Sequence, residues 1–508
     1  MSHLTALAAT SAVAETASRS VSASILRFIT CGSVDDGKST LIGRLLTETG
    51  SVPDDQLDAL ASDSRRFGTQ DGAVDYALLL DGLAAEREQG ITIDVAYRYF
   101  ATPRRSFIVA DAPGHKQYTR NMATGASTSD LAVLLVDARR GVLTQTRRHA
   151  LIASMLGIRH VVLAVNKMDL VGLVRGPFAA IEADFRRFAD GLGVETIACI
   201  PISAKRGLNV AVRSAEMPWY HGPSLLSYLE EIETEEADAA LPFRLPVQWV
   251  NRPSQDFRGY AGLIAAGTVR VGDRLLVQPA GLAASVARIV TADGDLPEAV
   301  AGDSVTLVLD DEIDVSRGDV LAAARHPATV ADAVDASVLW VSERPLQPGQ
   351  TYLLKSGAAT VSARVDAPEE GIDVETGAHT RIDGLTLNEI GRVRVRLDRP
   401  IAVDPYATSR QTGGFVLIDR VTNETVAMGL VERAVAPRRA HEMPWRSLAK
   451  ALSWRTTGTI VTVILAYLFT GKADIAAAIG GVEVVLKIGL FYLHERAWAH
   501  IRFGRSKA

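Results

Sequence analysis

The segment that most constrains the fold of this chain is the loop Gly32–Ser39, with the sequence GSVDDGKS. It follows a strand-like apolar run, Ile25–Thr30, and precedes a helix-like stretch, which is the context that a phosphate-binding loop requires. Its glycines let the backbone curl so that successive N–H groups face phosphate oxygens, and the dipole of the following helix adds to this attraction. A glycine-rich turn without a ligand is the alternative. The predicted contacts are made by Gly32, Ser33, Val34, Asp35, Asp36, Gly37, Lys38, Ser39 and Thr40.

Two side chains of this loop have separate predicted roles. Lys38 is placed to reach the β- and γ-phosphates of a nucleoside triphosphate, and the Ser39 hydroxyl is placed to coordinate Mg²⁺. Lysine usage supports the first role, because the chain has nine lysines against 45 arginines and yet keeps lysine here. A compact ammonium suits a phosphate site better than the planar guanidinium of arginine.

The surrounding sequence alternates short apolar runs with amphipathic stretches from about Ile25 to Leu229. This rhythm predicts a doubly wound α/β sheet, which binds its ligands at the carboxyl ends of the strands. The strand-like runs are Ile25–Thr30, Val95–Phe100, Phe107–Ala110, Leu131–Val136, Val161–Val165 and Ile197–Ile202.

A second motif, Asp111-Ala112-Pro113-Gly114-His115, follows the strand-like run Phe107–Ala110. A carboxylate at the end of a strand near the phosphates can hold the metal through water, and the backbone N–H of Gly114 can reach the γ-phosphate. Taken alone, this segment is equally typical of a turn that ends a strand. Its spacing after the phosphate loop favours the metal role for Asp111.

Two further motifs concern the base. Asn166-Lys167-Met168-Asp169 ends the run Val161–Val165. The Asp169 carboxylate can accept hydrogen bonds from both N1–H and the N2 amine of guanine, donors that adenine lacks. We expect Asn166 to tie loops together, the Lys167 stem to pack over the base, and Ser203-Ala204-Lys205 to offer a backbone N–H to the guanine oxygen. Together, the four motifs predict GTP and Mg²⁺ as the ligands.

The segment Arg87–Asp94, with the sequence REQGITID, resembles the first switch region of the elongation-factor-like GTPases. The resemblance implies that Thr92 closes on Mg²⁺ and the γ-phosphate, and that His115 orients the attacking water. The implied catalytic residues are therefore His115, Lys38 and Thr92, and the implied metal ligands are Ser39, Thr92 and Asp111. Outside its motif, His115 would be interpreted as an ordinary surface residue.

Within this superfamily the chain is more similar to the large, GTP-hydrolysing subunit of bacterial sulfate adenylyltransferase, from about Phe28 to Arg433. Translation factors usually carry histidine in place of Asp36, and the block Tyr76–Asp94 is also similar. A third block is Gln248–Pro253 followed by Asp256–Tyr260, although an ordinary barrel strand and loop would be the alternative there. A translation GTPase of the elongation-factor-Tu type is the competing interpretation of the whole chain.

This resemblance implies a heterodimer or a higher assembly. A smaller catalytic subunit joins ATP and sulfate into adenosine 5′-phosphosulfate and pyrophosphate, and the present chain couples GTP hydrolysis to that uphill step. The chain shows no second phosphate-binding loop, so we do not assign the adenylylsulfate kinase activity that is fused to many relatives. The net charge of −5 gives no indication of nucleic-acid binding.

Changes in composition and in the pattern of apolar runs divide the chain into five predicted parts. Residues 1–24 are small and polar and are expected to form a disordered leader. Residues 25–238 are the GTP-binding domain, which ends in the acidic linker Glu230–Asp238. Residues 241–330 and 331–436 contain short β-rich runs broken by turns, such as Gly262–Val269, and predict two small β-barrels. Two cysteines in a chain of this size fit a reducing cytoplasm.

The last part, residues 445–508, predicts an α-helical hairpin. Thr456–Thr470 is uncharged and apolar, Gly471–Lys472 is a turn, and Ala473–Leu493 is apolar apart from three charged residues. The segment carries nine Lys/Arg against three Asp/Glu, a local charge of +6. It resembles a short, uncharacterised membrane-associated domain in Arg455–Gly458 and Phe491–Trp498.

The resemblance implies attachment of a cytoplasmic protein to the inner face of the cell membrane. Basic residues flank both ends of the hairpin, which favours cytoplasmic ends. Glu483 and Lys487 are spaced to pair on a helix. The alternative is an amphipathic hairpin that packs on the protein or oligomerises. A third interpretation makes the whole chain a GTP-gated membrane scaffold.

Overall fold

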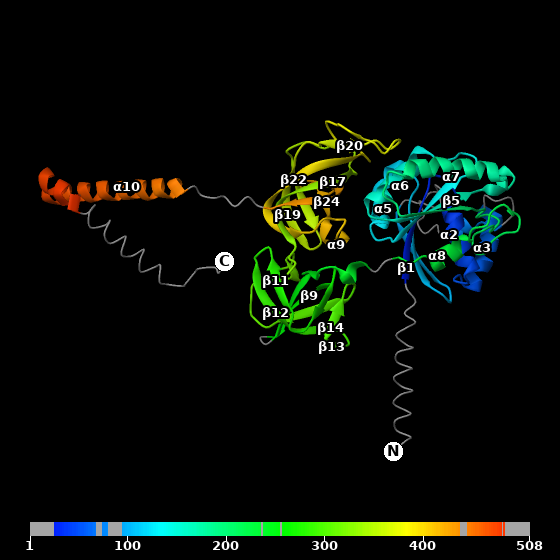
Figure 1. Ribbon diagram of the computed structural model, residues 1–508, viewed down its shortest axis with the longest axis horizontal. Coiled ribbons are helices and arrows are strands. Elements are labelled where there is room, and N and C mark those ends of the chain that lie inside the picture. The colour runs from blue at the N-terminus through cyan, green and yellow to red at the C-terminus, as the bar shows by residue number, and fades with distance from the viewer. Residues whose placement is uncertain are drawn as a thin grey trace, which may run out of the picture. The chain divides into compact units, whose positions relative to one another are not determined.

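The computed structural model describes residues 25–67, 74–79, 94–234, 237–254, 257–436, 444–479 and 481–482. The chain divides into a unit that ends at Pro437 and a second unit that begins at Arg438 (Figure 1). Several predictions lie outside the described residues. They concern the leader, Thr92 with most of its switch segment, Asp256, and the Glu483–Lys487 pair.

The first domain is built on a six-stranded sheet among these residues, with the order β2-β3-β1-β4-β5-β6. Five strands are parallel, and β2 pairs antiparallel with β3 at one edge. All seven residues of β4 are buried, as is typical of a central strand covered on both faces. The predicted α/β fold is therefore confirmed. The strands are β1 Ile25–Cys31, β2 Ala96–Ala101, β3 Ser106–Asp111, β4 Leu131–Asp137, β5 His160–Asn166 and β6 Thr196–Pro201.

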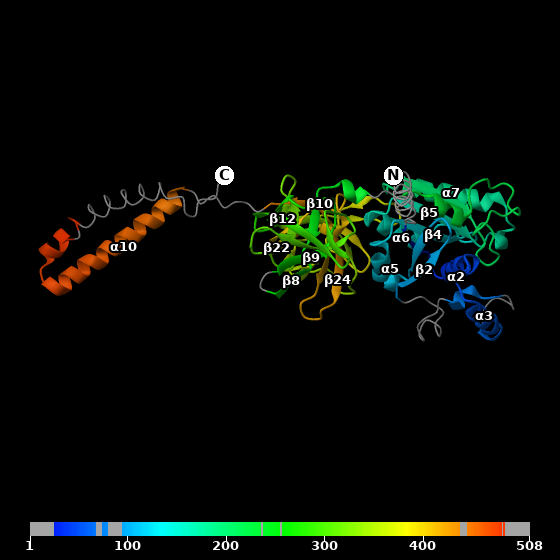
Figure 2. The same cartoon turned by 90° about the horizontal axis from the view of Figure 1, so that it is seen from below.

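Helices connect these strands (Figures 1 and 2). Apolar residues of the first of them, α2, are fully buried in the same core as the sheet. The helices are α2 Lys38–Glu48, α3 Asp54–Phe67, α5 Thr119–Ala126, α6 Thr144–Met155, α7 Arg175–Ala189 and α8 Leu225–Glu231. Short 3₁₀ turns are η1 Tyr76–Leu79, η2 Lys116–Tyr118, η3 Met168–Val171 and η4 Ala237–Ala240.

The register of the parallel strands aligns their carboxyl ends. Thr30 pairs with Asp111, and Asp137 pairs with Asn166. The loops that follow these strands therefore leave the sheet at one edge, which is where a doubly wound sheet binds its ligands.

The second domain is a mainly antiparallel β structure with the strand order β7-β16-β11-β12-β15-β9-β8 and β13 paired to β12. The predicted run Gly262–Val269 is in fact split, because Gly267 turns the chain with φ +78° against the Phe243 backbone. Trp249 is 65% exposed, so this aromatic residue of the Gln248–Pro253 block is not core. The strands are β7 Arg244–Pro246, β8 Trp249–Ser254, β9 Phe257–Leu263, β10 Thr268–Arg270, β11 Arg274–Gln278, β12 Leu282–Thr291, β13 Gly294–Leu296, β14 Glu298–Val300, β15 Ser304–Leu309 and β16 Val320–Ala323.

The third domain closes into a barrel, because β17 pairs with both β24 and β22. Closure removes the free sheet edges on those strands. The elements are β17 Thr329–Trp340, β18 Thr351–Ser356, β19 Ala359–Val365, β20 Glu370–Ile372, β21 His379–Thr380, β22 Ile390–Val403, α9 Arg410–Gly413, β23 Gly414–Ile418 and β24 Thr425–Val435.

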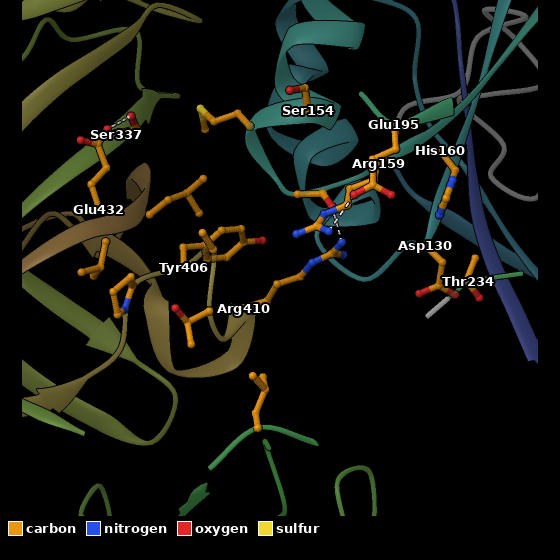
Figure 3. A pocket seen from close by; sticks show the side chains of 18 residues that line it. Asp130, Ser154, Arg159, His160, Glu195, Thr234, Ser337, Tyr406, Arg410 and Glu432 are labelled. Carbon is orange, nitrogen blue, oxygen red and sulfur yellow. Dashed lines mark hydrogen bonds and ion pairs between the residues drawn. The ribbon is translucent and has the colours of Figure 1, made fainter. Parts of the chain in front are cut away.

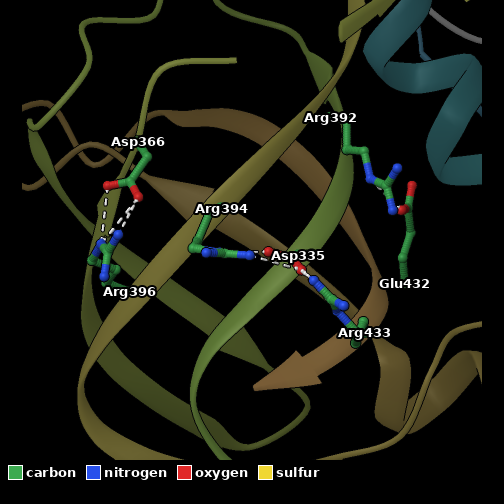
Figure 4. Close-up of polar contacts among 7 residues, drawn as sticks. All are labelled: Asp335, Asp366, Arg392, Arg394, Arg396, Glu432 and Arg433. Carbon is green, nitrogen blue, oxygen red and sulfur yellow. Dashed lines mark hydrogen bonds and ion pairs between the residues drawn. The ribbon is translucent and has the colours of Figure 1, made fainter. Parts of the chain in front are cut away.

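Ion pairs join neighbouring strands of this barrel (Figure 4). The Asp335 carboxylate of β17 pairs with two arginines. Arg394 Nε of β22 lies 2.6 Å from it, and Arg433 Nη2 of β24 lies 2.5 Å from it. The Arg394 guanidinium, aided by Arg433, holds the pKa of Asp335 below its usual value. One carboxylate therefore links three strands across the point where the barrel closes.

The third domain meets the first through hydrogen bonds to main-chain carbonyls. The Asn388 amide donates to Lys116 O at 2.8 Å. Lys116 directly follows His115 in the sequence. The Tyr406 hydroxyl donates to Leu156 O at 3.0 Å. Arg410 donates to the carbonyls of Ser129 and Gly157.

The second unit contains α10, Pro444–Thr470. This helix begins well before the predicted apolar run and includes Arg446, Lys450 and Arg455. Large apolar residues such as Leu468 and Phe469 are exposed, at 72% and 88%. Among the helices of the described residues, none is both long enough and apolar enough to cross a membrane.

Candidate functional site

The phosphate loop connects β1 to α2 and has the backbone shape that its glycines favour. Gly37 has φ +93° immediately before the helix, a value that a residue with a Cβ rarely adopts. The Lys38 ammonium donates to Gly32 O at 3.0 Å and to Ser33 O at 2.9 Å, so it lies across the curled loop. Burial lowers the pKa of Lys38, and the nearby Asp111 and Asp36 oppose that effect.

The Asp36 carboxylate is turned into the loop. One oxygen accepts the Ser33 N–H at 2.6 Å, the other has no partner among the described residues, and the residue is 1% exposed. Burial raises the pKa of Asp36. Its side chain therefore braces the curl of the loop from inside.

The Asp111–His115 segment lies directly against this loop. A Cβ on Gly114 would stand 2.7 Å from the Lys38 ammonium nitrogen and 2.8 Å from Gly32 O, so only glycine fits there. Asp111 is buried and accepts a hydrogen bond from the Thr30 hydroxyl at 3.4 Å. His115 is half-buried, and its ring meets Tyr118 edge-on at 6.3 Å.

Asn166 joins the phosphate loop to the predicted guanine loop. Its Nδ2 donates to Asp36 O at 2.8 Å, and its Oδ1 accepts the Ala204 N–H at 2.9 Å. Lys167, with φ +62°, donates to the Asp35 carbonyl. Asp169 follows in η3 and is half-buried. The fold thus brings segments from the ends of β1, β3, β5 and β6 to one place.

Asp137 is a site residue that the sequence reasoning missed. It lies at the carboxyl end of β4, where it contacts Lys167 at 3.1 Å and Arg139 at 2.6 Å. Although burial opposes it, hydrogen bonds from Arg139 and Lys167 bring the pKa of Asp137 below its usual value. An acidic residue just after the strand-like run Leu131–Val136 was the available signal.

The donor set suits a magnesium–nucleotide complex. Ser39 supplies a hydroxyl at the start of α2 and Asp111 a carboxylate beside the loop, and Mg²⁺ prefers such oxygen ligands together with phosphate oxygens and water. The buried Ser33 hydroxyl has no partner within the described part of the chain, which leaves it free for a ligand or water. The same part contains no cluster of three His, Cys, Asp or Glu residues that could hold a metal by itself.

A cavity of about 850 Å³ lies elsewhere, between residues of the first and third domains (Figure 3). None of the predicted nucleotide residues lines it. Its charged groups are largely paired. Arg159 forms an ion pair with Glu195 at 2.8 Å, and Arg410 donates hydrogen bonds to the main-chain carbonyls of Ser129 and Gly157. The convergence of the predicted motifs, rather than cavity size, therefore marks the candidate site.

Comparisons with protein families agree with this organisation. A family model described as the elongation factor Tu GTP binding domain matches residues 23–242. A model described as GTP-eEF1A C-terminal domain-like matches residues 333–432. A third, described as a predicted membrane protein (DUF2061), matches residues 448–499.

Three curated relatives cover most of the chain. "Sulfate adenylyltransferase subunit 1" of Methylorubrum extorquens (strain PA1) is 55% identical over 437 residues, which are 86% of this chain and 93% of that protein. The protein of the same name from Citrobacter koseri is 55% identical over 81% of this chain and 87% of its own length. "Bifunctional enzyme CysN/CysC" of Xylella fastidiosa is 57% identical over 81% of this chain and 66% of its own length.

Proposed function

This chain belongs to the family of sulfate adenylyltransferase subunit 1, and from that premise we propose that it drives sulfate activation with GTP. It hydrolyses GTP and couples the hydrolysis to the formation of adenosine 5′-phosphosulfate and pyrophosphate from ATP and sulfate. A smaller catalytic subunit carries out the adenylyl transfer, in a heterodimer or a higher assembly. The competing translation-factor interpretation is set aside, because the relatives that cover most of the chain carry the subunit name.

The bridge made by Asn166 is the observation that most supports a guanine-nucleotide site. It fixes the phosphate loop and the Ser203–Lys205 loop relative to each other through bonds of 2.8 and 2.9 Å. A ligand that spans both loops must carry phosphates at one end and a base at the other. Asp169 then favours guanine, because adenine would leave its carboxylate without donors.

The proposed roles follow from this placement. Lys38 and the loop amides bind the β- and γ-phosphates, and Gly114 offers its N–H to the γ-phosphate. Ser39, Asp111 and Thr92 would hold Mg²⁺, which supplies positive charge opposite the phosphate oxygens. His115 orients the attacking water.

The test is to co-purify the chain with a small adenylyltransferase subunit and to measure pyrophosphate release from ATP and sulfate. We expect GTP to stimulate release by the wild-type complex and to have no effect on a complex that carries Lys38→Ala. Equal release with and without GTP in the wild-type complex would refute the coupling. Failure of the two subunits to co-purify would refute the assembly.

We further propose that residues 445–508 attach the protein to the cell membrane. The match to a membrane-protein family model and the exposed apolar residues of α10 support this proposal. Basic residues before and after the apolar stretches would contact anionic lipid head groups. A carbonate wash of cell membranes should leave the full chain in the pellet, and release into the supernatant would contradict the proposal.

We also propose the division of the chain into parts at 1–24, 25–238, 241–330, 331–436 and 445–508. Two of these boundaries lie near observed features: the turn Ala237–Ala240 lies at the first, and β17 begins at Thr329, two residues before the boundary after residue 330. Limited proteolysis of the purified chain checks them, because cleavage is expected first between the parts.

A further inference from the structure

Arg44, in the second half of α2, has no role in the phosphate chemistry described above. Its guanidinium instead reaches the loop that follows β6. We propose that Arg44 is a positioning residue for guanine recognition, because it holds the Ser203–Lys205 loop at the place where the base must be read. This inference rests on the proposed GTP site.

The contact is made by one edge of a rigid group. Arg44 Nε donates to Ala204 O at 3.1 Å, and Nη2 donates to Lys205 O. A planar guanidinium presents these two donors in a fixed fork, whereas the donors of a lysine ammonium have no such fixed arrangement. Asn166 Oδ1 accepts the Ala204 N–H, so the loop is bonded through its N–H group to Asn166 and through its carbonyls to Arg44.

The guanidinium is itself held in place. It stacks over the Tyr76 ring at 4.4 Å, bonds to the Tyr76 hydroxyl at 3.2 Å and lies 3.5 Å from Glu48. The Arg44 side chain is 16% exposed. A side chain fixed by packing and neighbouring bonds can position another group more accurately than a free one.

Two glycines permit this arrangement. A Cβ on Gly43 would stand 2.2 Å from the Tyr76 carbonyl oxygen, so only glycine lets the Tyr76 segment approach α2. Gly207 has φ +73°, and a Cβ there would stand 2.7 Å from a Glu48 oxygen. Gly43 in α2 and Gly207, which follows the Ser203–Lys205 loop, therefore both leave room for this contact.

Helix α2 consequently links the two ends of the nucleotide site. It begins at Lys38, which faces the phosphates, and carries Arg44 six residues later, a rise of about 9 Å. Arg44 contacts the Ser203–Lys205 loop, Tyr76 and Glu48. Its removal should therefore affect base recognition and spare the phosphate contacts.

The experiment compares three diphosphates by competition against a fluorescent GDP. GDP is the reference, IDP lacks the N2 amine, and 6-thio-GDP replaces the guanine oxygen by sulfur, a weak hydrogen-bond acceptor. We expect Arg44→Ala to weaken GDP and IDP each by about tenfold and 6-thio-GDP by less than about threefold. Arg44→Lys should behave like Arg44→Ala, because an ammonium has neither the Nε–Nη2 fork nor the planar face that lies on the Tyr76 ring.

The matched control is Arg104→Ala, which removes an arginine that is 63% exposed and paired with Glu230. It should leave all three affinities unchanged. An equal loss of affinity for all three nucleotides in Arg44→Ala, or no loss at all, would overturn the proposal. A wild-type chain that binds ADP as tightly as GDP would instead refute the GTP site itself, so the two failures are distinguishable.

Discussion

Replacement of Arg244 by methionine tests how far the second and third domains depend on one buried ion pair. Arg244 binds Asp404 through two parallel bonds of 2.9 and 3.0 Å, and their side chains are 6% and 11% exposed. Arg244 also donates to the carbonyls of Phe243 and His326 at 2.9 and 2.8 Å. Methionine fills a similar volume but leaves the Asp404 charge with Thr412 as its remaining donor in the described structure.

The expected loss can be worked out from this burial. Removal of one partner of a buried pair costs about 3–5 kcal/mol, because the other charge stays buried and uncompensated. The pair joins the two β domains, which together have about 200 residues. For a unit of that size each kcal/mol shifts the melting temperature by about 2–4 °C, so Arg244→Met should lower the melting temperature of the two β domains by roughly 6–20 °C. Scanning calorimetry of the full chain measures this shift.

The chain offers a control of the same geometry at the surface. Arg288 binds Asp295 through bonds of 2.7 and 3.0 Å, but their side chains are 52% and 46% exposed. Because water solvates both charges, Arg288→Met should leave the melting temperature within the error of the measurement. The double variant Arg244→Met with Asp404→Leu should recover most of the loss, because it leaves no unpaired charge. Equal shifts for the buried and exposed pairs would refute the reasoning.

Four further predictions concern the first domain and the tail. Asp169→Asn should weaken GTP binding by about 100-fold, and retained discrimination against ATP in competition assays would contradict the guanine assignment. His115→Ala should slow single-turnover GTP hydrolysis by at least about 100-fold while GTP affinity stays unchanged. Burial, aided by Lys38, lowers the pKa of His149 from 6.5 to about 3. The unfolded chain therefore binds this proton first as the pH falls, so unfolding free energy should drop by up to about 1.4 kcal/mol per pH unit below 6.5, and His149→Leu should flatten that dependence in denaturant titrations. Deletion of residues 445–508 should leave the GTP hydrolysis rate intact, and a lost rate would show that the segment is more than an anchor.

The sequence allowed the nucleotide motifs to be predicted because each one lies at the carboxyl end of a strand. Apolar runs locate such strands, and a parallel sheet aligns their ends, so Asp111 and Asn166 could be placed without coordinates. The β1 loop was recognisable for the same reason. The order of the strands and the main-chain register were not needed for that inference.

Other parts of the site depend on contacts between residues far apart in the chain. Arg44 donates to carbonyls 160 and 161 residues away. Because every residue has a main-chain carbonyl, the sequence does not indicate which carbonyls accept these bonds. The Asp36 brace depends on how tightly its loop curls, which the pattern of glycines does not specify. The closing pair β17–β22 joins residues that only the folded barrel brings together, and the start of α10 at Pro444 is hidden because charged residues precede its apolar run.

The main-chain acceptors between the first and third domains have a consequence for mutational screens. Asn388, Tyr406 and Arg410 donate to the carbonyls of Lys116, Leu156, Ser129 and Gly157. Every residue type offers a main-chain carbonyl, whatever its side chain. Saturation mutagenesis should therefore detect these bonds through the donor residues of the barrel and overlook their acceptor positions. On the first-domain side, such a screen should detect Arg147, which donates to the Glu375 carbonyl at 3.4 Å and lies 3.7 Å from the Glu375 carboxylate. Homologous chains can drift in sequence at the acceptor positions and still keep these bonds.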